Sequence, residues 1–196
     1  MTSSEGGDND GVASNGKMIA AAWKSTATVA VFNADRALGF DARTPLLKGH
    51  TGSILDLTWS PFEDRLLATC GDDGKAKMWV FDDYEGLTGG ADRAEADLEL
   101  EAHSRKCMSV QWHSAAENLL ATHSNDRTVK VWDINEDRCD DAMITFTDMP
   151  DFCTSIRWSP DGKMIGGQCK NKTMVFFDPR QESSVLKAPG HIGPRQ

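Results

Sequence analysis

Residues 49–80, GHTGSILDLTWSPFEDRLLATCGDDGKAKMWV, decide the fold because their pattern returns 53 positions further along the chain. Four residue types keep this spacing without a gap: a histidine, a threonine, an aspartate and a tryptophan. The two sets are His50, Thr69, Asp73 and Trp79, and His103, Thr122, Asp126 and Trp132. Agreement at four such specific positions indicates an internal repeat, which sets the architecture of the whole chain.

Each repeat unit is expected to fold into short β-strands. In the first unit, apolar residues alternate with small or polar ones over residues 53–59, and Pro61 ends this run. A second strand is expected over residues 65–70 and a third over residues 75–81. The sequence GDDG at residues 71–74 supplies the residue types that a tight turn between them requires.

This pattern resembles the WD40 repeat, which has a Gly-His pair near its start and a Trp-Asp pair at the end of its third strand. The matching pairs are Gly49-His50 and Trp132-Asp133, and the relaxed versions are Ala102-His103 and Trp79-Val80. In WD40 blades the histidine, threonine, aspartate and tryptophan form a hydrogen-bonded relay. The resemblance therefore assigns the two repeated sets a structural role, since a half-satisfied buried network would be costly. A catalytic His-Asp dyad is the alternative, and the structural relay is favoured.

The rest of the chain is divided by reference to these units. Residues 1–10 form an acidic leader that is expected to be disordered. Four blades are expected at about residues 11–44, 45–101, 102–147 and 148–188, and the start of a further repeat at 189–196. The first blade lacks the relay histidine and aspartate, and the fourth blade has lost the relay. The acidic insertion at 81–102 is interpreted as a solvated surface loop with Leu98 and Leu100 in the fourth strand of the blade, in preference to a binding loop.

The expected fold is an all-β WD40 propeller that is partial or truncated. Propellers close as rings of typically four to eight blades, because an open run leaves unpaired edges and an uncovered apolar face. About four four-stranded antiparallel blades are visible in the sequence. The natural protein is expected to be longer, or the missing blades to come from another chain.

Composition excludes several classes of function. A net charge of -9 and a pI near 5.0 argue against a nucleic-acid binder that works through a basic face. No apolar run has the length of a membrane span, and the N-terminus lacks the features of a secretory signal, so the chain is expected to be intracellular. Its five cysteines are expected to be buried free thiols.

No motif indicates an enzyme, a cofactor or a metal site. The sequence has no phosphate-binding glycine loop, no HExxH and no GxSxG. His103, Cys107 and His113 come nearest to a ligand cluster, but alternation along a strand is expected to separate them. The chain is therefore expected to be non-enzymatic, with no cofactor, no metal and no catalytic residues.

A closer resemblance is to the coronins, the actin-associated family of WD40 proteins. It is carried by PLLKGHTG at 45–52, LDLTWSP at 55–61, EGLT at 85–88, DPR at 178–180 and GHIGPR at 190–195. The resemblance implies a seven-bladed propeller that binds filamentous actin and works with the Arp2/3 complex, followed by a unique region and a coiled coil.

The leading hypothesis is an actin-filament-binding cytoskeletal protein of coronin type in the cytoplasm. The alternative is a generic WD40 scaffold subunit of a larger assembly, bound to other protein subunits and not to actin. Because actin is acidic, a binding face would need cations. The candidates near the histidine loops and the turns are Lys48, Arg105, Lys106, Arg127, Lys170 and Lys172. Their interpretation as ordinary solvated surface charges is favoured over a binding role.

Overall fold

The computed structural model describes residues 11–23, 27–34, 44–82, 92–135, 139–147, 149–181 and 183–190, with the backbone alone at 183–185. These residues form β-strands and no α-helix. The strands are β1 (Val12–Ser14), β2 (Met18–Ala22), β3 (Val29–Asn33), β4 (Leu46–Leu47), β5 (Ile54–Trp59), β6 (Leu66–Gly71), β7 (Ala76–Val80), β8 (Leu98–Leu100), β9 (Cys107–Trp112), β10 (Leu119–Ser124), β11 (Val129–Asp133), β12 (Ile144–Phe146), β13 (Cys153–Trp158), β14 (Ile165–Cys169), β15 (Thr173–Asp178) and β16 (Ser183–Pro189).

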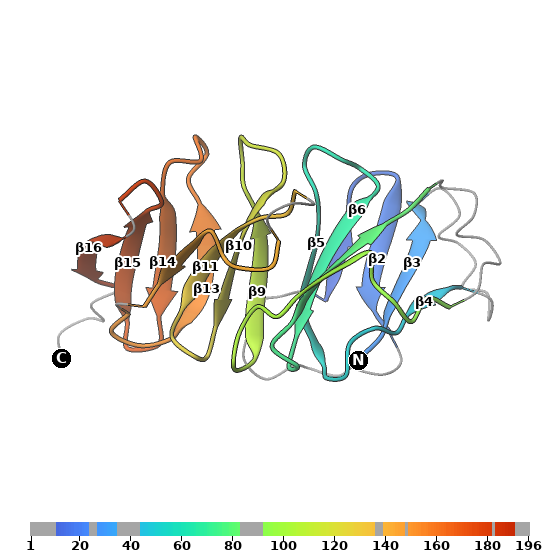
Figure 1. The fold of residues 1–196 in the computed structure, drawn as a ribbon, viewed down its shortest axis with the longest axis horizontal. Helices are drawn as coiled ribbons and strands as arrows, with labels where there is room; N and C mark the ends of the chain where they lie inside the picture. The colour runs from blue at the N-terminus through green and yellow to red at the C-terminus, as the bar shows by residue number, and fades with distance from the viewer. Residues whose placement is uncertain are drawn as a thin grey trace, which may run out of the picture.

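The strands form four antiparallel sheets of four strands each, and every sheet follows chain order: β1–β4, β5–β8, β9–β12 and β13–β16. Figure 1 shows the sheets standing side by side, from β1–β4 on the right to β13–β16 on the left. We call these sheets blades 1 to 4. The expected all-β architecture of four-stranded antiparallel blades is confirmed.

Three hydrophobic clusters fill the three junctions between successive blades. The alternation along β6 shows how one strand serves two junctions: Leu66 and Ala68 pack toward blade 3, whereas Leu67 packs toward blade 1. Successive side chains of a strand point to opposite faces, so a strand that is apolar on both faces must lie between two other layers. Full burial of one such leucine contributes about 2 kcal/mol to folding.

The limits of the blades differ from the expected ones at two places. Strand β4 pairs with β3, with Val29 opposite Leu47, so blade 1 extends past residue 44. Strand β16 runs to Pro189, which lies opposite Thr173, one residue beyond the expected end of blade 4. The repeat motif locates the Gly-His pair, which comes after the outer strand β4. It does not show whether that strand joins the sheet before it or the sheet after it. The expected leader at 1–10 and most of the expected next repeat, 191–196, lie outside the described residues.

The end of the acidic insertion is also more ordered than a solvated loop. Arg93 forms a parallel bridge with Leu47, and its backbone N–H donates to the Leu46 carbonyl at 2.9 Å. The Arg93 guanidinium lies over the rings of Trp79 and Phe81, at 5.7 and 5.9 Å from their centroids. This part of the insertion therefore ties blade 2 to the outer strand of blade 1.

Candidate functional site

The four repeated residues of blade 2 form a continuous chain of hydrogen bonds. His50 Nδ1 lies 2.9 Å from an Asp73 carboxylate oxygen, and His50 Nε2 lies 2.9 Å from Thr69 Oγ1. The Trp79 indole N–H donates to the same Thr69 oxygen at 3.0 Å. The chain thereby joins the loop before β5, the strands β6 and β7 and the turn between them.

Blade 3 repeats this arrangement with one addition. His103 Nε2 lies 2.8 Å from Thr122 Oγ1, which accepts the Trp132 indole N–H at 3.0 Å. His103 Nδ1 lies 3.1 Å from Asp126 and 3.0 Å from the hydroxyl of Thr128, which itself donates to Asp126 at 2.6 Å. The extra hydroxyl gives the aspartate of this blade one more donor than its counterpart in blade 2 has.

The protonation state of both histidines follows from their surroundings. Burial lowers the pKa of His50 and of His103, although the neighbouring aspartates act in the opposite direction. Burial acts to raise the pKa of Asp126, but the hydrogen bonds from His103 and Thr128 outweigh it and hold that pKa well below its usual range. Each ring is therefore neutral at pH 7: Nδ1 donates to the carboxylate, and Nε2 accepts from the threonine hydroxyl.

These relays are closed to a substrate. His50 is 5% exposed, His103 is 9% exposed, and Thr69 and Thr122 are fully buried. Every polar atom of the histidine rings is already engaged within the blade, so neither ring has a nitrogen available for proton transfer to a bound molecule. The arrangement fixes loops, and its chemistry is that of a structural relay.

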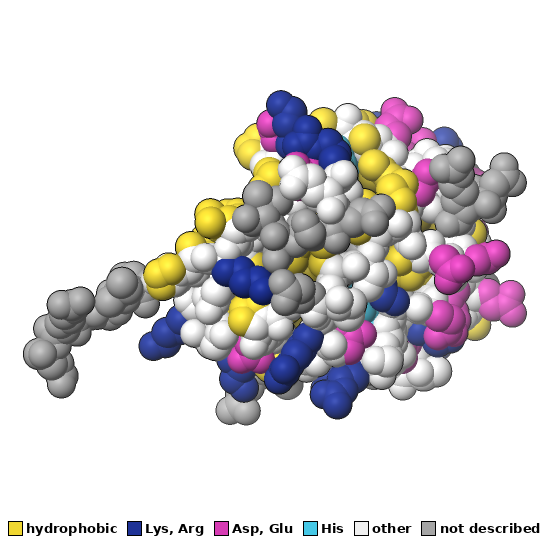
Figure 2. All heavy atoms as spheres, turned by 60° about the vertical axis from the view of Figure 1, so that its left-hand side comes forward, with side chains coloured by type: hydrophobic (Ala, Val, Ile, Leu, Met, Phe, Trp, Pro, Cys, Tyr) yellow, Lys and Arg dark blue, Asp and Glu magenta, His cyan; other side chains and the backbone are white. Residues whose placement is uncertain are grey.

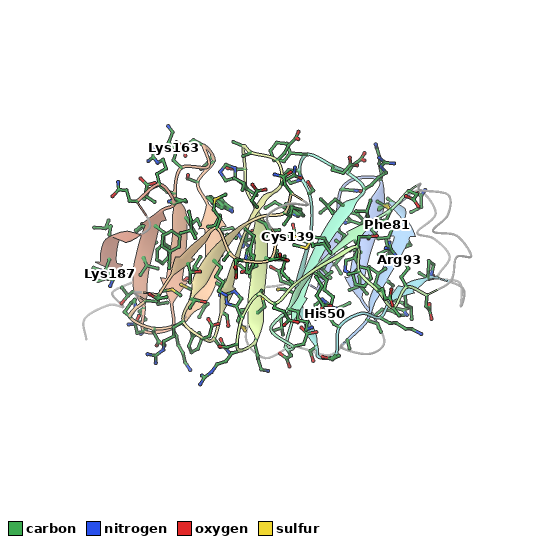
Figure 3. The ribbon with its side chains drawn as sticks, in the orientation of Figure 1. His50, Phe81, Arg93, Cys139, Lys163 and Lys187 are labelled. Atoms are coloured by element: carbon green, nitrogen blue, oxygen red, sulfur yellow. The ribbon has the colours of Figure 1, made fainter. Side chains whose placement is uncertain are left out.

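The relays mark one end of the sheets. We call this end the relay rim; it consists of the loops 48–53, 101–106 and 149–152 and the turns 72–75, 125–128 and 170–172. The opposite end, with the loops 60–65, 113–118 and 159–164, is the far rim. Figure 3 shows His50 at the lower end of the molecule and Lys163 at the upper end. Neighbouring blades meet along the relay rim, where the His103 backbone N–H donates to the Gly74 carbonyl at 2.8 Å.

All six candidate partner-binding residues lie on the relay rim, but the structure divides them into two groups. Lys48 forms an ion pair with Asp92 at 2.5 Å, and Lys106 forms one with Asp72 at 3.0 Å. Lys170 lies over the Phe152 ring, with Nζ 5.1 Å from its centroid. The other three, Arg105, Arg127 and Lys172, are exposed and have no carboxylate within ion-pair distance among the described residues.

Sequence reasoning missed a second repeated contact, made by the tryptophans at the ends of the innermost strands. The indole N–H groups of Trp59, Trp112 and Trp158 each donate at 3.2 Å to a backbone carbonyl of the preceding blade's innermost strand. The acceptors are Ala13, Thr58 and Gln111. The signal was present in the sequence, since Trp-Ser-Pro at 59–61 corresponds to Trp112-His113-Ser114 and returns at 158–160. Only the packed blades show where these indoles point.

A buried carboxylate adds to the contact between blades 2 and 3. Asp56 Oδ2 accepts hydrogen bonds from the Ser109 hydroxyl at 2.6 Å and from the Val110 backbone N–H at 3.1 Å. Burial raises the pKa of Asp56, against the lowering effect of these donors. Asp56 therefore forms a contact between blades 2 and 3. The repeat pattern did not indicate this contact, because the aspartate is not repeated: the corresponding residue of blade 3 is Ser109.

The three residues nearest to a ligand cluster are not brought together. His103 belongs to the relay rim, whereas His113 lies on the far rim, where Nε2 donates to the Gly162 carbonyl at 3.0 Å and Nδ1 accepts two backbone N–H groups. Cys107 is fully buried in the junction between blades 2 and 3. The part of the chain that the structure describes holds no group of three or more His, Cys, Asp or Glu side chains able to bind a metal. It also holds no helix long and apolar enough to cross a membrane.

Comparisons with known proteins agree with this geometry. The pattern described as "WD domain, G-beta repeat" matches residues 42–80 and 96–133. A coronin-like protein of Schizosaccharomyces pombe is 36% identical over 76% of the chain, one of Saccharomyces cerevisiae is 31% identical over 95%, and Coronin-2A of Homo sapiens is 30% identical over 79%. The chain spans 24–29% of the length of these relatives.

A solved structure extends the agreement to three dimensions. The crystal structure of the WD40 domain from Toxoplasma gondii coronin matches 99% of the chain with a TM-score of 0.86 and 26% identity, and the match covers 48% of that domain's chain. The expected partial WD40 propeller is thereby confirmed. Repeat pattern, sequence relatives and fold point to one family, and the chain belongs to the coronins.

Proposed function

We propose that this chain is a non-enzymatic protein-interaction module that binds actin filaments in the cytoplasm. One observation carries the proposal: coronin relatives match the chain over most of its length, and the fold match is to a coronin WD40 domain. The Arp2/3 complex is the further partner that membership of this family suggests. Nucleic acid is not a proposed partner, because the net charge of -9 opposes binding to a phosphate backbone.

The geometry supports a binding module in preference to a catalyst. The titratable groups that the relays bury are engaged with one another, and two of the exposed cations of the relay rim, Arg105 and Arg127, stand on loops that a relay fixes. A rigid rim of loops on a propeller is a common surface for protein recognition, because fixed loops lose little conformational entropy on binding.

Co-sedimentation with actin filaments tests this function. We expect the purified chain to pellet with filaments at 50 mM salt, to pellet less at 200 mM salt because the contact is electrostatic, and to stay in solution without filaments. Circular dichroism of the same sample controls for folding. A folded chain that stays in the supernatant at both salt concentrations would contradict actin binding and favour the scaffold-subunit alternative.

A further inference from the structure

We propose that the relay rim of blades 3 and 4 is a docking surface for an acidic protein face, and that Arg105, Arg127 and Lys172 bind its carboxylates. The identity of the partner, an acidic face of the actin filament, rests on the proposed function. The choice of surface does not, because it follows from the charges and backbone geometry described here.

The first argument is the distribution of charge. Three cations of this rim are already paired: Lys48 with Asp92, Lys106 with Asp72, and Lys75 with Glu99 and Glu101. On blades 3 and 4, the described carboxylates of the rim are Glu101, which pairs with Lys75 at 2.6 Å, Asp126, which is held in the relay, and Asp151, which accepts its neighbour's backbone N–H at 2.8 Å. Figure 2 shows Lys and Arg side chains gathered along the lower edge of the molecule, while most of the acidic side chains in that view lie to the right. A cationic rim on a chain of net charge -9 would steer an acidic partner to one face.

The second argument is the backbone conformation of two of the cations. Arg127 and Lys172 both have a φ of 66°, in the left-handed region that L-residues rarely adopt. They occupy the same turn position in blades 3 and 4 that Gly74, with a φ of 78°, occupies in blade 2. Each of these two turns thus has a long cationic residue at a position where glycine or asparagine would fit with less strain. Strained residues gather at functional sites, where the side chain has a use that offsets the strain.

The third argument is that the relay holds two of the cations in place. Asp126 accepts the backbone N–H of Ser104 at 3.3 Å and that of Thr128 at 3.0 Å. Ser104 precedes Arg105 in the sequence and Thr128 follows Arg127, so these bonds hold the backbone beside both arginines. The Ser124 hydroxyl also donates to the Arg105 carbonyl at 3.4 Å. Because both loops are fixed before binding, a partner would not have to order them. This links the buried relay to the surface that it supports.

The test compares Arg127→Asn with Lys172→Asn, as a double variant, against a matched double variant on the far rim, Arg65→Asn with Lys163→Asn. Both pairs remove one arginine and one lysine. We expect the relay-rim variant to bind filaments at least tenfold more weakly and with a smaller dependence on salt, and the far-rim variant to change affinity less than twofold. We also expect the relay-rim variant to melt at the same or a higher temperature, because asparagine tolerates the left-handed turn better. Equal affinity of the two variants would overturn the proposal.

A second probe separates this proposal from the actin proposal. Immobilised polyglutamate presents carboxylates without any actin structure. If the unsubstituted chain does not bind filaments but is retained on polyglutamate, and only the relay-rim variant loses that retention, the actin function fails and the docking surface stands. If all three chains are retained equally, or none is retained on either probe, the docking surface is wrong.

Discussion

A single hydroxyl, that of Thr122, connects the buried residues of blade 3. It accepts the Trp132 indole N–H and donates to His103 Nε2, so two otherwise separate side chains share one oxygen. All three residues are at most 9% exposed, and water cannot replace a lost partner there. Thr69 has the same position in blade 2, which explains why the repeat requires threonine at this step.

We expect Thr122→Val, which keeps the shape and removes the oxygen, to lower the free energy of unfolding by about 1–3 kcal/mol, because it leaves a buried indole N–H and a ring nitrogen unpaired. Denaturant titration measures the change. Thr145→Val on the exposed face of β12 is the matched control, and we expect it to shift stability by less than about 0.5 kcal/mol. Equal effects of the two substitutions would contradict the role of the hydroxyl.

His123 has the opposite character, since it is fully buried and neither ring nitrogen has a hydrogen-bond partner among the described residues. Burial lowers its pKa to about 3, and the nearby His103 and Arg157 add to the effect. The corresponding residue of blade 2 is the apolar Cys70, 53 positions earlier. The polar ring is therefore a weak point in the junction between blades 3 and 4.

This histidine predicts a loss of stability in acid. Its pKa is lower in the folded state than in the unfolded state, so the unfolded chain takes up a proton first, and stability falls as pH drops below 6.5 toward about 3. The slope from this one group approaches about 1.4 kcal/mol per pH unit. We expect His123→Leu to be at least as stable at pH 7 and to lose less stability between pH 7 and pH 5, as measured by denaturant titration at each pH. His50 and His103 also have lowered pKa values, so part of the dependence of stability on pH is expected to persist in this variant. A slope equal to that of the unsubstituted chain would contradict the role of His123.

At the scale of the element, the innermost strands show how a propeller protects its edges. β5, β9 and β13 are edge strands of their sheets, and an unpaired edge invites association with other chains. The carbonyls of Thr58 and Gln111 on these edges are covered by tryptophan indoles from the next blade, and Asp56 covers the Val110 N–H. Side chains thus take the place of a neighbouring strand.

We expect Trp112→Phe to destabilise the chain by at least about 1 kcal/mol, because one interblade hydrogen bond is lost and the smaller phenyl ring fills less of the buried site. Hydrogen exchange should locate the effect: protection falls in β5 and β9 for Trp112→Phe, and in β9 and β13 for Trp158→Phe. The two variants control for each other. A uniform loss of protection in both would mean that these bonds do not act at separate junctions.

At the scale of the whole molecule, the outer face of blade 4 carries adjacent exposed apolar side chains. Val175 and Phe177 face the core, so Met174 and Phe176 on the same strand face outward, and Leu186 lies opposite Phe176. Met174 is 40% exposed and Leu186 is 55% exposed. Adjacent exposed apolar side chains on a sheet face favour association.

We expect Met174→Lys with Leu186→Lys to raise the monomer fraction at high concentration, as measured by light scattering after size exclusion. The added lysines bring the net charge of -9 closer to zero, which by itself favours association, so a gain in monomer would come from the lost apolar surface. Phe62→Lys, at an isolated exposed apolar residue on the far rim, is the control and should change little. No gain in monomer would show that this face does not drive association.

The sequence by itself determined the repeat, the strand order within each unit and the residue types of the relay. Strand alternation and turn chemistry act over a few residues, so the repeat and its strands follow from the sequence pattern, and the resemblance to the WD40 repeat supplied the relay. The resemblance to the WD40 repeat placed His50 with Asp73, and the two side chains lie 2.9 Å apart.

Only the tertiary structure decided what happens between the blades. The acceptor of the Trp112 indole, the Ser109 hydroxyl that donates to Asp56 and the partner of Lys48 come from other blades or from the long insertion, and no local spacing encodes those pairings. These contacts also decide which cations are free to bind a partner. Six candidate cations look alike in the sequence, and two of them form ion pairs once the blades pack. Contacts within a blade follow from local periodicity, whereas contacts between blades follow from how whole sheets lie against each other.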